Sequence, residues 1–414
     1  MLPVQLSIHQ RLVQRIQAIV PGRELENRRG RGELVVLTRI TDSDGRHWQT
    51  GIRLNLINVQ AGVKSQELTF TVAAFVQPGD YHLFIALCDT KTMEHSFIRR
   101  TLRVAPLKPD PLPEAWLGLP PVEFLPAVES PDSWFLPDVK GLLHLPVESK
   151  QPARVDLLVN VTPSERSNAP ASSLRRSMAS VIPAMKILSG LKTPVQPPGV
   201  AVVDLARHRI TFDVANAATL DWTVLGKALT ASNPAVIDVK SLAGQRSMRE
   251  YFADEVARRA GPPGPPRWLI VMSGSLFFSK QEETPLPELP PDPNRHIIYM
   301  HFTSGFGSSG FGAFGFGGSA NGGGRPGRGA PSLPGLGPDP GAQIAPAERI
   351  RGPEPGRGPA GGGQGRGRGG PGGAPFPDDL EHVLKSMGAR VINVTTPEQF
   401  RKDLASLIAE ISAN

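Results

Sequence analysis

The sequence predicts a protein of mixed class, in which an all-β region precedes an α/β domain. Three observations support this prediction. Residues 1–105 contain five or six short stretches in which apolar and polar residues alternate, as in sheets with one buried face. Arg154–Ser167 reads as a buried strand followed by a polar loop, and a helical pattern opens at Ser172, which is how an α/β domain begins. Residues 303–375 are dominated by Gly, Pro, Arg and Phe and separate two parts of that domain.

Turn sequences bound the expected strands of the all-β region. Asp42-Ser43-Asp44-Gly45 predicts a hairpin turn, because Gly provides the positive φ that such turns require. The expected strands are Glu33–Thr41, Gln49–Leu56, Gln66–Val76, Tyr81–Cys88 and Ser96–Val104. Short strands of this kind predict a β-sandwich over residues 1–105. The pattern FxxPGxYxLxxxxxD, from Phe75 to Asp89, resembles immunoglobulin-like (Ig-like) modules of bacterial surface proteins.

The N-terminus reads as the middle of a strand, because Val4, Leu6 and Ile8 alternate with polar residues. It has no charged region followed by an apolar core, so it does not predict a signal peptide. A chain that starts inside a strand suggests either a trimmed N-terminus or a misplaced start, and an upstream signal peptide would favour an extracytoplasmic or cell-envelope location. No apolar run approaches the roughly 20 residues that a membrane span needs. The single cysteine, Cys88, is expected to be a buried structural thiol.

Residues 106–152 form a proline-rich connector that also carries aromatic residues. Trp116, Phe124, Trp134 and Phe135 are unusual in a plain linker, because disordered segments are poor in such residues. We expect an extended segment that is partly ordered by these aromatics against one or both domains. The alternative is a polyproline arm that binds a partner.

Residues 153–302 and 376–414 are expected to form the α/β domain. Arg267–Met272 is a continuous apolar run, as in the middle of a parallel sheet, and Pro183 is expected to kink the first helix or end it early. The other expected strands are Val155–Val159, Val200–Asp204, Arg209–Val214 (antiparallel to the one before it), Arg295–Phe302 and Ala389–Val394. The expected helices are Ser172–Leu188, Leu220–Leu229, Arg246–Ala260, Asp378–Met387 and Pro397–Ile411.

This order of elements resembles the von Willebrand factor A (VWA) domain, which implies a doubly wound sheet with helices on both faces. The hairpin VAVVDLARHRITFDV and the ending GARVINVTTPEQFRKDLASLIAEI are similar to the second and third strands and to the last strand and helix of that family. The resemblance covers most of residues 153–302 and 376–414. It implies a protein that binds other proteins.

The resemblance also implies a metal site, which this chain carries in degenerate form. The family motif Asp-x-Ser-x-Ser falls on Asn160, Thr162 and Ser164, and Ser273-Gly274-Ser275 follows the central strand where the family has an Asp. Ser232 and Asn233 are poor matches to the family's second-loop Thr. Since Mg²⁺ usually relies on carboxylates and these positions offer neutral oxygens, we expect no Mg²⁺ or other cofactor here, and a strand-end face formed by Ser273 and Ser275.

No other motif predicts an enzyme. Gly305–Gly310 fits GxGxxG, but Phe-Gly repeats follow it in place of the helix that a dinucleotide site needs. The histidines His208, His296, His301 and His382 lack ligand spacing, and nothing nominates a nucleophile with a base. A hydrolase is the least favoured alternative, and it would need a compact carboxylate or Ser/His cluster in a pocket at the strand ends.

The charge of +7 is uneven. Residues 303–375 hold seven Arg and three acidic residues, which gives +4 of that total, so the remainder is nearly balanced. The segment is expected to be disordered, and its Arg-Gly repeats predict, as an alternative function, binding of RNA or another polyanion. The favoured interpretation is a non-enzymatic interaction or scaffold protein with an unknown protein partner.

Overall fold

The computed structural model describes residues 2–30, 32–59, 61–125, 141–162, 170–231, 248–276, 286–303 and 378–413. Nearly all of the Arg-Gly-rich segment lies outside these ranges, so the RNA-binding alternative stays a prediction. Residues 126–140 of the connector, with Trp134 and Phe135, also lie outside them. Within the described ranges, no helix combines the length and apolar character needed to cross a membrane.

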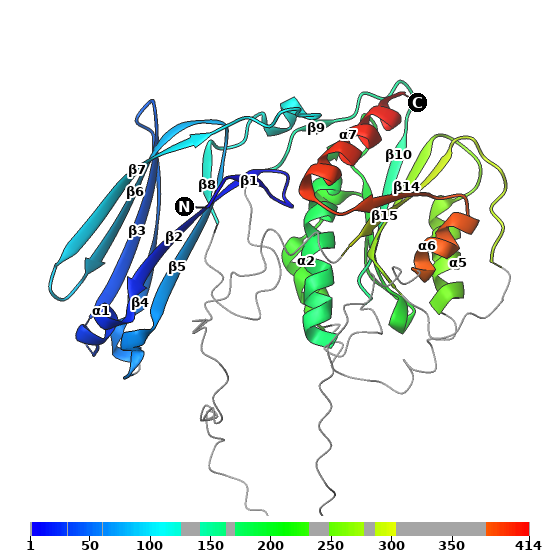
Figure 1. Ribbon diagram of the computed structural model, residues 1–414. Coiled ribbons are helices and arrows are strands. Elements are labelled where there is room, and N and C mark those ends of the chain that lie inside the picture. The colour runs from blue at the N-terminus through cyan, green and yellow to red at the C-terminus, as the bar shows by residue number, and fades with distance from the viewer. Residues whose placement is uncertain are drawn as a thin grey trace, which may run out of the picture. The chain divides into compact units, whose positions relative to one another are not determined.

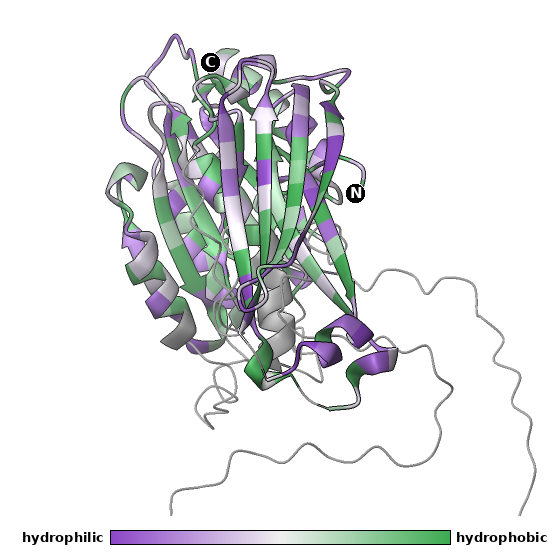
Figure 2. Cartoon of the chain, turned by 90° about the vertical axis from the view of Figure 1, so that its left-hand side faces the viewer, coloured by the Kyte–Doolittle hydropathy of each residue, from purple (hydrophilic) through white to green (hydrophobic). Residues whose placement is uncertain are grey.

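The N-terminal part contains two four-stranded sheets among the described residues (Figure 1). The first has the order β1-β2-β5-β8 and the second β4-β3-β6-β7. Their bounds are β1 Gln5–Leu6, β2 Leu12–Pro21, β3 Glu33–Asp42, β4 His47–Asn55, β5 Glu67–Val76, β6 Gly79–Asp89, β7 His95–Val104 and β8 Val122–Phe124, with helix α1 at Gly22–Asn27. The pairing is antiparallel, and Figure 2 shows hydrophilic and hydrophobic residues alternating along the strands. Side chains from both sheets share one core, among them Ile16, Ile40 and Leu83.

The strand β2 was not predicted from the sequence. Its buried apolar residues include Leu12, Ile16 and Val20, which are spaced by four and fit a helix as well as a strand. Gln14 lies between Leu12 and Ile16 on the same face of the strand, where an apolar residue would have completed a strand pattern. It is buried, and its side chain donates to the Leu2 and Arg15 carbonyl oxygens. The prediction of a strand through Val4–Ile8 was too long, since β1 holds only two residues.

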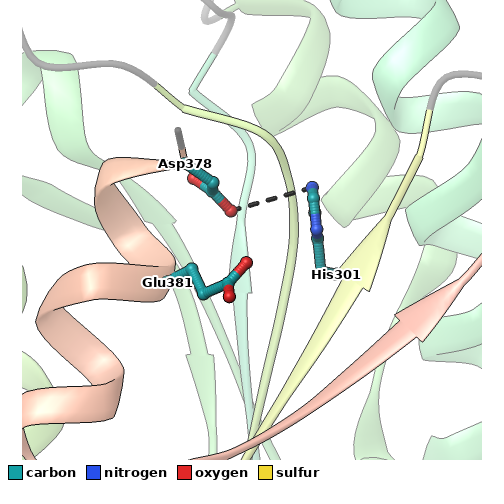
Figure 3. Close-up of side chains that lie close together, drawn as sticks. All are labelled: His301, Asp378 and Glu381. Atoms are coloured by element: carbon teal, nitrogen blue, oxygen red, sulfur yellow. Dashed lines mark ion pairs between the residues drawn. The ribbon is translucent and has the colours of Figure 1, made fainter. Parts of the chain in front are cut away.

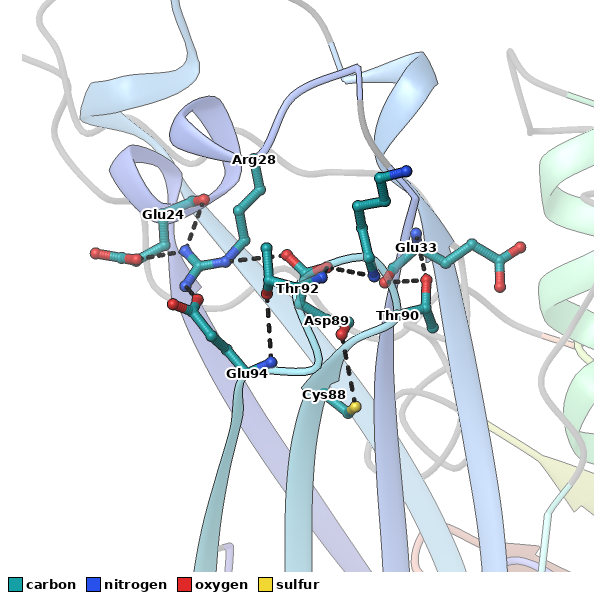
Figure 4. Close-up of polar contacts among 9 residues, drawn as sticks. Glu24, Arg28, Glu33, Cys88, Asp89, Thr90, Thr92 and Glu94 are labelled. Atoms are coloured by element: carbon teal, nitrogen blue, oxygen red, sulfur yellow. Dashed lines mark hydrogen bonds and ion pairs between the residues drawn. The ribbon is translucent and has the colours of Figure 1, made fainter.

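An ion-pair cluster joins α1 to the turn between β6 and β7 (Figure 4). The Arg28 guanidinium lies 2.6 Å from Glu24, 2.9 Å from Glu94 and 3.3 Å from Asp89. Asp89 Oδ1 also accepts the backbone N–H groups of Lys91 and Thr92, so this carboxylate organises the turn. Cys88, just before it, is only half-buried, so the prediction of a buried thiol was wrong in degree.

The α/β part is built on a six-stranded sheet of order β13-β12-β10-β14-β15-β16. All neighbouring pairs are parallel except β12 with β13, which confirms the predicted antiparallel pair. The strands are β10 Arg154–Asn160, β12 Gly199–Asp204, β13 Arg209–Val214, β14 Arg267–Gly274, β15 Arg295–Phe302 and β16 Arg390–Val394, with a small separate pair, β9 Leu145–Pro146 and β11 Leu191–Lys192. The helices are α2 Pro170–Ser189, α3 Trp222–Ala231, α5 Met248–Ala260, α6 Asp379–Ser386 and α7 Pro397–Ala413.

Helices cover both faces of this sheet (Figure 1). Leu157 and Val159 of β10 pack with residues of α2, α3 and α7, whereas Leu158 packs with residues of α5 and α6. The mixed class predicted from the sequence is therefore confirmed. Pro183 does not end α2 early, because the helix continues to Ser189. Val181, Met185 and Leu188 are buried around the proline, so tertiary packing outweighs its local cost.

Candidate functional site

The carboxyl ends of β10 and β14 lie at the point where the order of the sheet reverses. The next strands in the chain, β12 and β13, lie on one side of β10, and the later strands β14, β15 and β16 lie on its other side. In open α/β sheets, ligands bind in the crevice beyond such a reversal point. Asn160 is the last residue of β10, and Ser273 is the next-to-last residue of β14.

The predicted metal-motif residues at this point bond to one another and to the backbone. Asn160 Nδ2 donates to Ser273 Oγ at 2.9 Å, and Asn160 Oδ1 accepts the Thr162 N–H at 3.0 Å. Thr162 Oγ1 accepts the Leu205 N–H at 2.7 Å, and the Ser273 hydroxyl donates to the Gly274 carbonyl oxygen at 2.6 Å. All three side chains are buried. Ser164, Ser232 and Asn233 lie outside the described residues. The described positions therefore form a neutral set of mutually satisfied polar groups.

Ser273 and Ser275, predicted to share one strand-end face, have different partners. Ser275 Oγ lies 2.7 Å from His301 Nε2, and His301 Nδ1 lies 3.0 Å from Asn393 Oδ1. His301, which was expected to be a surface or strand-edge residue, lies near the end of β15, where its side chain is only 12% exposed and contacts three other polar side chains. The arrangement places a hydroxyl, an imidazole and an amide in series.

His301 also faces two carboxylates from α6 (Figure 3). Its Nε2 lies 3.7 Å from Asp378 Oδ2, and one ligand atom from each of His301, Asp378 and Glu381 falls within 4.8 Å of the others. Asp378 is the N-cap residue of α6, and its Oδ1 accepts the Leu380 N–H at 3.3 Å and the Leu276 N–H at 3.0 Å. The Tyr299 hydroxyl donates to Asp378 Oδ2 at 2.6 Å.

Burial dominates the electrostatics of this cluster. It raises the pKa of Asp378 above its ordinary value, although the hydrogen bonds from Tyr299 and Leu276 act in the opposite direction. Burial also raises the pKa of Tyr299 well above its ordinary value, and the neighbouring Asp378 carboxylate adds to this effect. Tyr299 is therefore a neutral hydrogen-bond donor at physiological pH.

The sequence carried one signal for this cluster. Asp378 was predicted as a helix start, and a helix that follows a parallel sheet strand begins near the carboxyl edge of the sheet. The partner of that carboxylate could not be found, because His301 lies 77 residues earlier, across the Arg-Gly-rich segment. The chain matches no protein-family model, and no curated protein is significantly similar to it in sequence.

Proposed function

We propose that this chain is a non-enzymatic interaction protein, in which a VWA-like α/β domain binds a protein partner at the carboxyl edge of its sheet without a bound Mg²⁺. The observation that carries the proposal is the hydrogen bond from Asn160 to Ser273 at the reversal point of the sheet. In the VWA family, to which the chain is similar in its order of elements, these positions hold a cation through carboxylates.

Two physical arguments support independence from Mg²⁺. The described groups are neutral, so they offer a hard dication none of the charge that usually holds it. They are also already bonded, because Asn160 Oδ1 accepts the Thr162 N–H and Thr162 Oγ1 accepts the Leu205 N–H, so a cation would have to compete with these N–H groups for the same oxygens. A buried N–H without an acceptor costs about 1–3 kcal/mol.

A photo-crosslinking experiment tests this proposal. A photoreactive amino acid replaces Thr395, which is exposed just after β16 at the carboxyl edge, and in a matched variant replaces Gln151, which is exposed before β10 at the amino edge. We expect one partner to crosslink from Thr395 and not from Gln151 in the source cells, and its affinity, measured with purified proteins, to be the same with EDTA and with Mg²⁺. Equal crosslinking from both edges, or binding that EDTA abolishes, would contradict the proposal.

A hydrolase is the second candidate, because the series Ser275–His301–Asn393 has the order of a nucleophile, a base and a group that orients the base. Ser275 Oγ is within hydrogen-bond reach of His301 Nε2, as proton abstraction requires.

A fluorophosphonate probe separates the two candidates. A hydrolase of this kind would be labelled at Ser275, and H301A would slow labelling by about 100-fold or more. S386A, which changes an exposed serine of α6, is the matched control. A hydrolase would keep its labelling in S386A and lose it in S275A, whereas the interaction protein predicts that the unaltered chain is labelled no more than S275A.

A further inference from the structure

We propose that His301, Asp378 and Glu381 form a site for a borderline divalent metal ion, and that Zn²⁺ is the ion it binds most tightly. This inference goes beyond the proposed function, which needs no metal. The site lies beside the degenerate motif but has different ligands, which come from β15 and from the start of α6 (Figure 3).

The distance between the nearest His301 and Asp378 side-chain atoms suits a metal ion bound by both better than a direct hydrogen bond between them. His301 Nε2 and Asp378 Oδ2 are 3.7 Å apart, which is too long for a hydrogen bond. Two ligand atoms that each lie about 2.1 Å from a tetrahedral Zn²⁺ are roughly 3.4 Å apart. A shift of a few tenths of an ångström would therefore seat the ion between them. Glu381 brings the third atom within 4.8 Å of both.

The ligands are held in place by their own neighbours. A histidine that binds a metal through one nitrogen usually donates the other N–H to an acceptor, and Asn393 Oδ1 lies 3.0 Å from His301 Nδ1. Asp378 is fixed through the Tyr299 hydroxyl and the N–H groups of Leu276 and Leu380. These contacts leave Asp378 Oδ2 facing His301.

Two contacts compete with a metal. The Ser275 hydroxyl lies against His301 Nε2, and its rotation about one bond frees that lone pair. Lys385 pairs with Glu381 at 2.7 Å, but its side chain is 59% exposed, so water replaces this contact at little cost. The set of one imidazole nitrogen and two carboxylate oxygens suits Zn²⁺, whereas Mg²⁺ prefers oxygen ligands alone. Water or Ser275 Oγ would complete a tetrahedral shell.

Zn²⁺ titration of the whole, EDTA-stripped chain tests the site. We expect one Zn²⁺ bound per chain in competition with a chromophoric chelator, and visible absorption bands when Co²⁺ replaces Zn²⁺. H301A should lose both, and E381Q should weaken Zn²⁺ binding by at least about tenfold. The matched controls are H382A and E398Q, which change an exposed histidine of α6 and an exposed glutamate of α7.

The outcomes are decisive as long as each variant melts cooperatively, which thermal unfolding checks. Binding that survives H301A, or that H382A reduces equally, would place the ion elsewhere and overturn the proposal. Absence of Zn²⁺ binding by the unaltered chain would also overturn it and would leave His301 and Asp378 as neighbouring polar groups without a shared ion. Neither result bears on partner binding at Thr395. The Zn²⁺ site and the proposed interaction function can therefore be disproved independently of each other.

Discussion

Asn160 and Ser273 are 113 residues apart in the chain, and the amide of one donates to the hydroxyl of the other at 2.9 Å. Both side chains are almost fully buried. The bond places two neutral polar groups side by side at the strand ends, where the proposed resemblance to the VWA family predicts carboxylates.

Introducing two carboxylates at the strand ends should create a site that binds Mg²⁺. In the double variant N160D/S273D, two carboxylates would face each other in a buried place, and without metal the free energy of unfolding should fall by at least about 3 kcal/mol. Mg²⁺ should raise its melting temperature and leave that of the unaltered chain unchanged. Scanning fluorimetry with and without Mg²⁺ measures this, and stabilisation of the unaltered chain by Mg²⁺ would contradict the degenerate site.

Arg401 connects α7 to the connector and to the N-terminal residues. It is buried, forms a bidentate pair with Asp110 at 2.7 and 2.9 Å, and its guanidinium lies 4.7 Å from the centre of the Trp116 ring. The Trp116 indole N–H in turn donates to the Gln10 carbonyl oxygen. These contacts link α7 to Asp110 and Trp116 of the connector, and Trp116 to Gln10.

Truncating Arg401 should therefore destabilise the whole protein. R401A leaves Asp110 without its cation and should lower the free energy of unfolding by about 3–5 kcal/mol in urea denaturation. R103A, which breaks an exposed pair with Asp80, should have little or no effect. Equal effects of the two variants would show that the Arg401 pair does not support the fold.

His9 should make the protein sensitive to mild acid. Burial, with smaller contributions from Lys186 and Arg11, lowers the pKa of His9 to about 3. Below pH 6.5 the unfolded chain binds a proton here that the folded chain does not, so stability falls as the pH falls from 6.5 towards 3. Because of His9, the free energy of unfolding should be about 2 kcal/mol lower at pH 5 than at pH 8.

The variant H9Q isolates this contribution. Urea midpoints between pH 5 and pH 8 should vary less with pH in H9Q than in the unaltered chain. H382A, which removes an exposed histidine, should keep the full pH dependence. An unchanged pH dependence in H9Q would mean that His9 is protonated in the folded chain.

Tyr299 should act as a positioning residue for Asp378. Y299F removes the hydroxyl that donates at 2.6 Å, and the free energy of unfolding should fall by about 1–3 kcal/mol. Its Zn²⁺ affinity should also fall, because Asp378 Oδ2 loses its orientation. Y251F at the half-buried Tyr251 is the control, and equal losses in both variants would show that the Tyr299 hydroxyl plays no special part.

The sequence by itself determined the class of the fold and most elements of the α/β part, because these depend on local patterns. The continuous apolar run of β14 and the helical period of α7 are readable in one short window. A hairpin between β12 and β13 follows from the short segment that joins them. The sequence also determined that the strand-end motif lacks carboxylates, since that is a matter of composition.

Only the tertiary structure decided which polar residues meet. The parallel register of β14 and β15 places Ser273 beside His301, and the same carboxyl edge receives Asp378 from beyond the Arg-Gly-rich segment. Sequence separation carries no information about such a contact, because a long connection adds little closure entropy. The burial that raises the pKa of Asp378 arises from surrounding elements, so the chemistry of this edge exists only once the sheet is assembled.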